Sequence, residues 1–257
     1  MIKARVICIV GNSFCGSTLL SRLLATIEGV GAAGEVHWMY DAPAEGWVAT
    51  KAGWKVTRRC VRCGPSCPVF TSEFVLDLPP RHLLYQHVAR QLGVEALIVS
   101  DKMPGTYETY CEERDADGIV MFKRPEAAIL SEMVNEKVTL GEAVSNYANS
   151  YEHLLRWTPR FFRQVSFVSY EDVASAPWVM TGKVKETMGI DGGPPRKGLF
   201  SAGDYHAVGG NPKAHLRRDI SLDERWKTQL TDEQKATIQQ SEKAMIVYRE
   251  LMSRRVT

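Results

Sequence analysis

Hydrophobic residues in this chain form short continuous runs that alternate with stripes at helical spacing. The runs cover residues 6–10, 96–99, 118–122 and 165–168. Continuous apolar runs of this length are typical of strands that are buried on both faces. Between them, apolar residues recur at helical spacing over residues 19–27, 81–92 and 141–157,. The pattern predicts buried strands that alternate with amphipathic helices.

Boundary residues add detail to this pattern. Gly93 ends the helix over 81–92, and Pro177 and Gly189 open and close another helix,. Thr231 and Gln234 form a capping box for a last helix, which we expect to continue to about Tyr248,. Glycine and alanine dominate residues 29–36, which predicts a turn, and prolines and glycines predict an irregular segment over about 40–80,.

A glycine-bounded loop separates the first strand from the first helix. Its sequence is Gly11-Asn12-Ser13-Phe14-Cys15-Gly16-Ser17-Thr18. A helix N-terminus offers unpaired N–H groups to an anion, and glycines let the backbone approach it closely. The spacing nearly matches the Walker A pattern, but Ser17 stands where that pattern has lysine,. The loop therefore suits a phosphate or sulfate, and an ATP or GTP phosphotransferase is disfavoured.

Residues 15–20, Cys-Gly-Ser-Thr-Leu-Leu, and the later pair Gly34-Glu35 resemble the 3′-phosphoadenosine-5′-phosphosulfate (PAPS) dependent sulfotransferase superfamily. Further segments resemble it in family order along nearly the whole chain. These are the cysteine-rich residues 60–68, as in a C-x-x-C-G insertion of bacterial members, and residues 102–104, 123–131, 170–173, 205–213 and 223–230. The chain is thus similar to the bacterial type of this superfamily.

The resemblance implies an α/β, P-loop-like three-layer fold with a central parallel sheet flanked by helices. It implies one sulfotransferase-like domain over residues 1–257, with the Cys/Pro-rich insertion at about 40–80. The implied reaction is direct in-line transfer of a sulfuryl group from PAPS to a hydroxyl or amine of a small molecule or carbohydrate. Adenosine 3′,5′-bisphosphate (PAP) would be the product, and no metal is required.

The resemblance also assigns the donor-binding residues. Lys123 and Ser131 would hold the 3′-phosphate, and Tyr170 would lie near the adenosine. The glycine-bounded loop would hold the 5′-phosphosulfate through Asn12, Ser13, Phe14, Cys15, Gly16, Ser17 and Thr18. A later loop would close over the donor with Asn211 and Lys213. Lys123 stands where the family has arginine, and Phe14 where many members have a basic residue.

Four residues are candidates for the chemistry. Glu35 and His37 follow the anion-binding unit closely, so either side chain could act as a general base or have only a structural role,. In some members of the family the glutamate takes the proton of the acceptor, so the resemblance implies this role for Glu35, with His37 or His206 as substitutes. Lys102 follows a buried strand, where open α/β sheets place ligands, and would stabilise charge on the sulfonate and the leaving oxygen,.

Three closely spaced cysteines, Cys60, Cys63 and Cys67, resemble a zinc knuckle,. A fourth ligand is not evident nearby in the sequence; His37, Cys111 or a distant cysteine would have to supply it. Zinc, a disulfide and reduced thiols all stay open, with reduced thiols favoured, and we assign no metal here.

The composition of the chain mainly excludes some kinds of partner and location. The chain has 32 basic and 30 acidic residues, a net charge of +2, which indicates no nucleic-acid partner,. No apolar run is long enough for a membrane span, and the N-terminus lacks a signal-peptide pattern, so we expect a cytoplasmic protein. Trp38, Trp47 and Trp54 favour a small molecule or glycan over a polyanion as acceptor. Because of Phe14, a non-catalytic nucleotide-binding protein of the same fold is the alternative function, and a P-loop kinase is less favoured.

Overall fold

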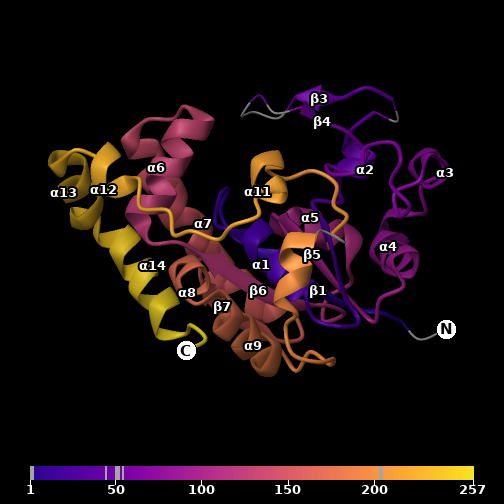
Figure 1. The fold of residues 1–257 in the computed structure, drawn as a ribbon. Helices are drawn as coiled ribbons and strands as arrows, with labels where there is room; N and C mark the ends of the chain where they lie inside the picture. Colours follow the sequence, from indigo (N-terminus) through magenta and orange to yellow (C-terminus); the bar gives the residue numbers. More distant parts are fainter. Residues whose placement is uncertain (1–2, 44, 50–52, 54, 203–204) are drawn as a thin grey trace.

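A five-stranded parallel sheet forms the centre of the protein, in the order β2-β5-β1-β6-β7 (Figure 1). The strands are β1 (Arg5–Val10), β2 (Val30–Gly34), β5 (Ala96–Lys102), β6 (Asp117–Phe122) and β7 (Val165–Ser169). The computed structural model describes residues 3–43, 45–49, 53, 55–202 and 205–257; Trp54 lies outside them. The four predicted strands and the central parallel sheet are confirmed.

Helices cover both faces of the sheet, which gives three layers. Alternate residues of β1 point to opposite faces. Ile7 and Ile9 pack in the core shared with α1 (Ser17–Leu24), α8 (Tyr170–Ser175) and α9 (Pro177–Met188). Cys8 and Val10 belong to the core shared with α4 (Leu84–Leu92) and α7 (Leu140–Phe161). The predicted three-layer α/β fold is therefore present.

The turn predicted over residues 29–36 is wrong, because Val30–Gly34 is the edge strand β2. Glycine and alanine are poor strand formers, so the local sequence does not indicate a strand. Tertiary pairing compensates: the N–H of Val208 donates to the carbonyl of Ala33 at 3.0 Å. Gly34 has φ of 76°, and a Cβ there would lie 2.6 Å from the carbonyl oxygen of Val208. The segment 205–210, hereafter the tail segment, thus depends on a glycine in β2.

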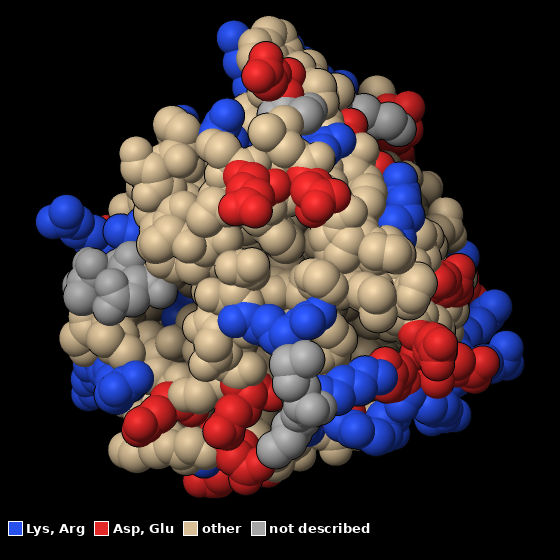
Figure 2. Space-filling model, turned by 90° about the vertical axis from the view of Figure 1, so that its right-hand side faces the viewer, with Lys and Arg blue, Asp and Glu red and all other residues tan. Residues whose placement is uncertain are grey.

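Short elements occupy the predicted irregular segment. They are α2 (Trp38–Asp41), the paired strands β3 (Val48–Ala49) and β4 (Lys55–Val56), and α3 (Ser72–Leu76), followed by the 3₁₀ turn η1 (Arg81–Leu83). In Figure 1, α2 and α3 lie on the same side of the molecule as α4, and β3 and β4 lie at the top of the view. On the face that carries α3 and α4, basic and acidic side chains are interspersed (Figure 2).

The predicted last helix is in fact two helices. The capping box of Thr231 and Gln234 is confirmed at the start of α13 (Asp232–Gln240), but the chain breaks at Ser241, where ψ is 95°. A second helix, α14 (Glu242–Ser253), then packs against α7. The remaining helices are α5 (Pro104–Tyr110), α6 (Pro125–Glu136), α10 (Lys197–Ala202), α11 (Pro212–Leu216) and α12 (Trp226–Gln229). Within the described residues, every helix is too short or too polar to span a membrane.

Close packing of β6 against α7 gives a stability prediction. A Cβ at Gly118 would lie 2.3 Å from the ring of Phe162, so Gly118→Ala must displace that ring. We expect a loss of roughly 1–3 kcal/mol in the free energy of unfolding, measured in urea. Gly141 in α7 has open space around its Cβ position. The control Gly141→Ala should be neutral or stabilise by about 0.5–1 kcal/mol. Equal effects of the two substitutions would contradict this packing.

Candidate active site

The candidate site lies at the carboxyl ends of the three central strands. β1 is flanked by β5 and β6, so the chain connections diverge there and the loop after β1 lies at a topological switch point,. Lys102 is the last residue of β5, and Lys123 directly follows β6. Since parallel strands end at one edge of the sheet, the fold places both lysines beside the loop over residues 11–16.

Two glycines allow the loop to fold tightly. A Cβ at Gly11 would lie 2.4 Å from the carbonyl oxygen of Met121. Gly16, with φ of 99°, precedes α1, and a Cβ there would lie 2.6 Å from the ring of Tyr170. Phe14 also has a left-handed backbone, with φ of 63°, which costs a non-glycine residue about 1–2 kcal/mol,. The loop therefore turns sharply and presents its backbone at the start of the helix.

The loop residues lie between the two lysines. Ser17 and Thr18 are buried in the first turn of α1, where N–H groups have no helical acceptor,. Burial raises the pKa of the Cys15 thiol, and the positive charges of Lys102 and, more weakly, Lys123 oppose that rise. Both ammonium groups thus act electrostatically at the same loop position. The loop is therefore compact, and both lysines make the electrostatic potential there more positive.

Lys102 and Glu35 form an ion pair at the end of β5. Lys102 Nζ donates to Oε1 of Glu35, and Trp38 Nε1 donates to Oε2 at 3.2 Å. Burial raises the pKa of Glu35, but the charge and hydrogen bond of Lys102 outweigh this and lower it. Burial lowers the pKa of Lys102, and the charge of Glu35 more than reverses this. Lys102 also has φ of 66°, a strained conformation of the kind found at functional sites,.

His37 is held by a buried carboxylate. Its Nδ1 lies 2.8 Å from Oδ1 of Asp101, and the hydroxyl of Tyr85 donates to Oδ2 at 2.6 Å. Burial lowers the pKa of His37, but the hydrogen bond and charge of Asp101 outweigh it, so the pKa lies above its ordinary value. Because Asp101 accepts from Nδ1–H, Nε2 of the neutral ring is the nitrogen that can take a proton.

Lys123 is buried over the face of Tyr170, with Nζ 4.2 Å from the ring centroid. Burial lowers the pKa of Lys123, and Asp223, 3.7 Å away, opposes this. The pKa of Asp223 is lowered to about 2, mainly because the Arg225 side chain donates hydrogen bonds to its carboxylate. The hydroxyl of Tyr170 donates to the carbonyl of Ser221 at 3.2 Å and accepts from the N–H of Asp223 at 3.1 Å, so Tyr170 holds both residues.

The other predicted site residues lie as follows. The Ser131 hydroxyl is buried within α6 and donates to the carbonyl of Ala127 at 2.8 Å. Asn211 Oδ1 caps α11 by accepting from the N–H of Lys213 at 3.0 Å, and Lys213 is exposed. The Nδ1 of His206 contacts the thiols of Cys63 and Cys67 at 3.4 and 3.3 Å. The structure therefore brings Glu35, His37 and Lys102 together, whereas His206 lies with the cysteines.

Sequence reasoning missed three residues of this site. Asp101 was visible beside Lys102 at the strand end, but its partners His37 and Tyr85 come from distant segments. Asp223 lies in the segment 223–230, which the sequence indicated only as a stretch that resembles the family. His215 is buried, and its Nε2 donates to the carbonyl of Gly209 at 3.0 Å, while its Nδ1 has no partner among the described residues. Burial is the main cause that lowers the pKa of His215 to about 4, so its ring is neutral.

The fold has counterparts among solved structures. A sulfotransferase domain from the curacin biosynthetic pathway superposes with a TM-score of 0.58 at 14% identity, covering 98% of each chain. A sulfotransferase domain from the Synechococcus PCC 7002 olefin synthase superposes with a TM-score of 0.57 at 17% identity, covering 93% of this chain and 94% of that domain. No protein-family model and no curated protein matches the sequence. The chain thus has the fold of sulfotransferase domains.

Proposed function

We propose that this protein is a PAPS-dependent sulfotransferase that acts on a hydroxyl or amine of a small molecule or carbohydrate. One observation carries the proposal: the glycine-bounded loop after β1 lies at the switch point, and the strands on either side of β1 end in Lys102 and lead into the buried Lys123. An anion held on this loop is flanked by a cation on each side. This arrangement suits a donor with two anionic groups, a 5′-phosphosulfate and a 3′-phosphate.

The residues present fit this donor. Gly11 and Gly16 let the loop pack closely against Met121 and Tyr170. The unpaired N–H groups at the start of α1 would then bind the 5′-phosphosulfate. Lys123 would bind the 3′-phosphate, with Ser131 in the following helix and Tyr170 beside the adenosine. Asp223 forms an ion pair with Lys123 in the absence of donor. The 3′-phosphate must therefore displace this carboxylate as the partner of the Lys123 ammonium group.

When bound, the donor supplies a sulfuryl group whose bond to the phosphate oxygen breaks as the acceptor oxygen bonds to sulfur. Lys102 stabilises the negative charge that develops on the transferred group and the leaving oxygen. Glu35 holds the Lys102 side chain ionised and oriented in the buried site. Phe14 stands where many relatives have a cation, so Lys102 carries more of this task here.

His37 is our first candidate for the base, because its orientation is fixed and its Nε2 can accept the acceptor's proton. Glu35 is less suited, since its low pKa and its pairing with Lys102 make it a weak base,. A cavity of about 180 Å³ adjoins this side of the site, between β4 and the glycines Gly209 and Gly210. Gly210 lies against Glu35, so the cavity offers a route for the acceptor.

Donor recognition gives a direct test. Lys123→Ala should weaken PAP binding by at least about 10-fold, because a buried phosphate contact is worth roughly 1.5–3 kcal/mol, while ADP binding should change little. Affinities are measured by calorimetry, with Lys243→Ala on the exposed face of α14 as control. PAP release from PAPS with a panel of phenols, amines and sugars tests transfer itself. Equal losses for PAP and ADP would contradict a 3′-phosphate site at Lys123.

The second candidate function is a non-catalytic nucleotide-binding protein of the same fold. It is favoured by the pairing of both lysines with carboxylates and by Phe14 in the loop. PAP binding without PAP release from PAPS would support it. A kinase is disfavoured by Ser17, which stands in place of the Walker A lysine, and by Asp101, whose two carboxylate oxygens already bond His37 and Tyr85.

A further inference from the structure

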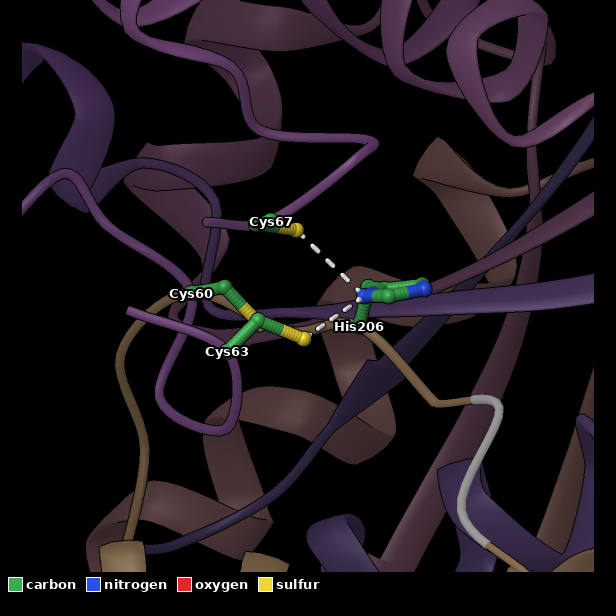
Figure 3. Close-up of side chains that lie close together, drawn as sticks. All are labelled: Cys60, Cys63, Cys67 and His206. Carbon is green, nitrogen blue, oxygen red and sulfur yellow. Dashed lines mark hydrogen bonds between the residues drawn. The ribbon is translucent and has the colours of Figure 1, made fainter. Parts of the chain in front are cut away.

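Four potential metal ligands from two distant segments meet beside the active site. They are Cys60, Cys63, Cys67 and His206, hereafter the Cys–His cluster (Figure 3). One ligand atom from each residue lies within 4.8 Å of all the others. His206 Nδ1 is 3.4 Å from the sulfur of Cys63 and 3.3 Å from that of Cys67. We propose that this cluster binds one zinc ion in a structural site.

The distances suit zinc. Zn–S bonds of about 2.3 Å and Zn–N bonds of about 2.0 Å in a tetrahedron separate the ligand atoms by roughly 3.5–3.8 Å. The cluster already approaches this spacing, so an ion requires only small side-chain shifts. Three thiolates with one imidazole form a Cys₃His set, which is a common structural zinc site and leaves no position open for a substrate.

The backbone around the cluster has the form of a ligand-bearing turn. The N–H of Gly64 donates to the carbonyl of Cys60 at 3.0 Å, and Gly64 has the left-handed φ of 58° that closes the turn. The N–H of Phe70 lies 3.3 Å from the sulfur of Cys67 and donates to it. Cys60 and Cys67 are buried. Donors of this kind stabilise thiolate ligands, as second-shell groups do at metal sites.

The sequence alone left the fourth ligand open, and the fold supplies it from the tail segment. The N–H of Val61 donates to the carbonyl of Ala207 at 2.8 Å, so the cysteine turn and the tail segment are already paired. The next residue of the tail, Val208, accepts from the N–H of Glu35 at 2.8 Å. An ion in the cluster therefore fixes the insertion to the tail segment and, through it, the backbone of Glu35.

Elemental analysis of protein purified without chelator tests this site. We expect about one zinc per chain, and a fall in the unfolding temperature when a strong chelator removes it. Cys63→Ser and His206→Gln should lose the zinc. The matched controls Cys111→Ser and His82→Ala, which change a thiol and an imidazole outside the cluster, should keep it.

His206→Cys separates ligation from folding. A Cys₄ set also binds zinc, so this variant should keep one zinc per chain although it lacks the imidazole. If Cys63→Ser does not fold, cobalt added to metal-free wild-type protein gives a second readout: thiolate-bound tetrahedral cobalt absorbs strongly in the visible range. Wild-type protein that neither contains nor takes up zinc or cobalt, or that shows a disulfide within the cluster by mass spectrometry, would overturn the proposal. So would full zinc retention in His206→Gln.

Discussion

Replacing Lys102 with alanine should lower the turnover number for sulfuryl transfer by about 10²–10³-fold, because it removes the main group that stabilises charge in the transition state. PAP affinity should change by less than about threefold, since the 3′-phosphate and the loop backbone carry donor binding. Turnover is measured as PAP release from PAPS, and affinity by calorimetry with PAP. The two readouts separate charge stabilisation from binding.

Lys102→Ala also breaks the ion pair with Glu35, which makes its effect on turnover harder to interpret. In Lys102→Ala the buried carboxylate of Glu35 has no cation, so the pKa of Glu35 rises and the site rearranges. The double variant Lys102→Ala/Glu35→Gln removes this unpaired charge and should be as slow as the single variant. Recovery of turnover in the double variant, or an unaffected rate in Lys102→Ala, would exclude a direct role of Lys102 in transfer.

Asp101→Asn should have the second largest effect, a loss of about 10²-fold or more in turnover, because general base catalysis contributes about 10²–10⁴-fold. Asp101 fixes the His37 ring and raises its pKa. As a base, His37 must be neutral, so the wild-type rate should rise with pH through a value above the ordinary pKa of histidine. In Asp101→Asn this inflection should move to lower pH while the maximal rate falls.

Tyr85→Phe serves as the matched control, because it removes only the outer hydrogen bond to Asp101. Its turnover should fall much less, and its inflection should stay near that of the wild type. If Glu35 is the base instead, the inflection should lie below pH 4.5, the ordinary value for glutamate, and should not respond to Asp101→Asn. The pH profile therefore decides between the two candidate bases.

The same interaction affects stability. The folded-state pKa of His37 is raised, so its pairing with Asp101 stabilises the fold fully below the unfolded value near pH 6.5,. The contribution is lost as pH rises through the folded pKa. Unfolding of wild type and Asp101→Asn, compared from pH 5 to pH 9, should therefore converge toward high pH. A difference that grows with pH would contradict this pairing.

Local patterns in the sequence predicted much of the fold. The four apolar runs are strands, and the glycine-bounded loop lies before α1, because both depend on burial and backbone geometry within a few residues. The strand β2 was missed because its residues Val-Gly-Ala-Ala-Gly have weak strand propensity and pair through β5 and the tail segment. Ser241 splits the last helix although the helical pattern continues beyond it.

The sequence predicted candidate residues for the site but not the contacts between them. Glu35, His37 and Lys102 were recognised from their positions after the loop helix and a buried strand. That Lys102 pairs with Glu35, and that Asp101 holds His37, depends on segments more than 60 residues apart, as their separations of 67 and 64 show. The same holds for His206, which was predicted as a substitute base and which lies with the cysteines. Tertiary packing determines these pairings.

Thermal unfolding with PAP, ADP and ATP at matched concentrations tests the donor site most directly. A ligand at about 100 times its dissociation constant adds about 2.7 kcal/mol. For a chain of 257 residues this raises the unfolding temperature by roughly 5–10 °C,. We predict this shift with PAP and a clearly smaller one with ADP and ATP. Stabilisation by ADP or ATP alone, or no shift with PAP, would contradict a PAPS site between Lys102 and Lys123.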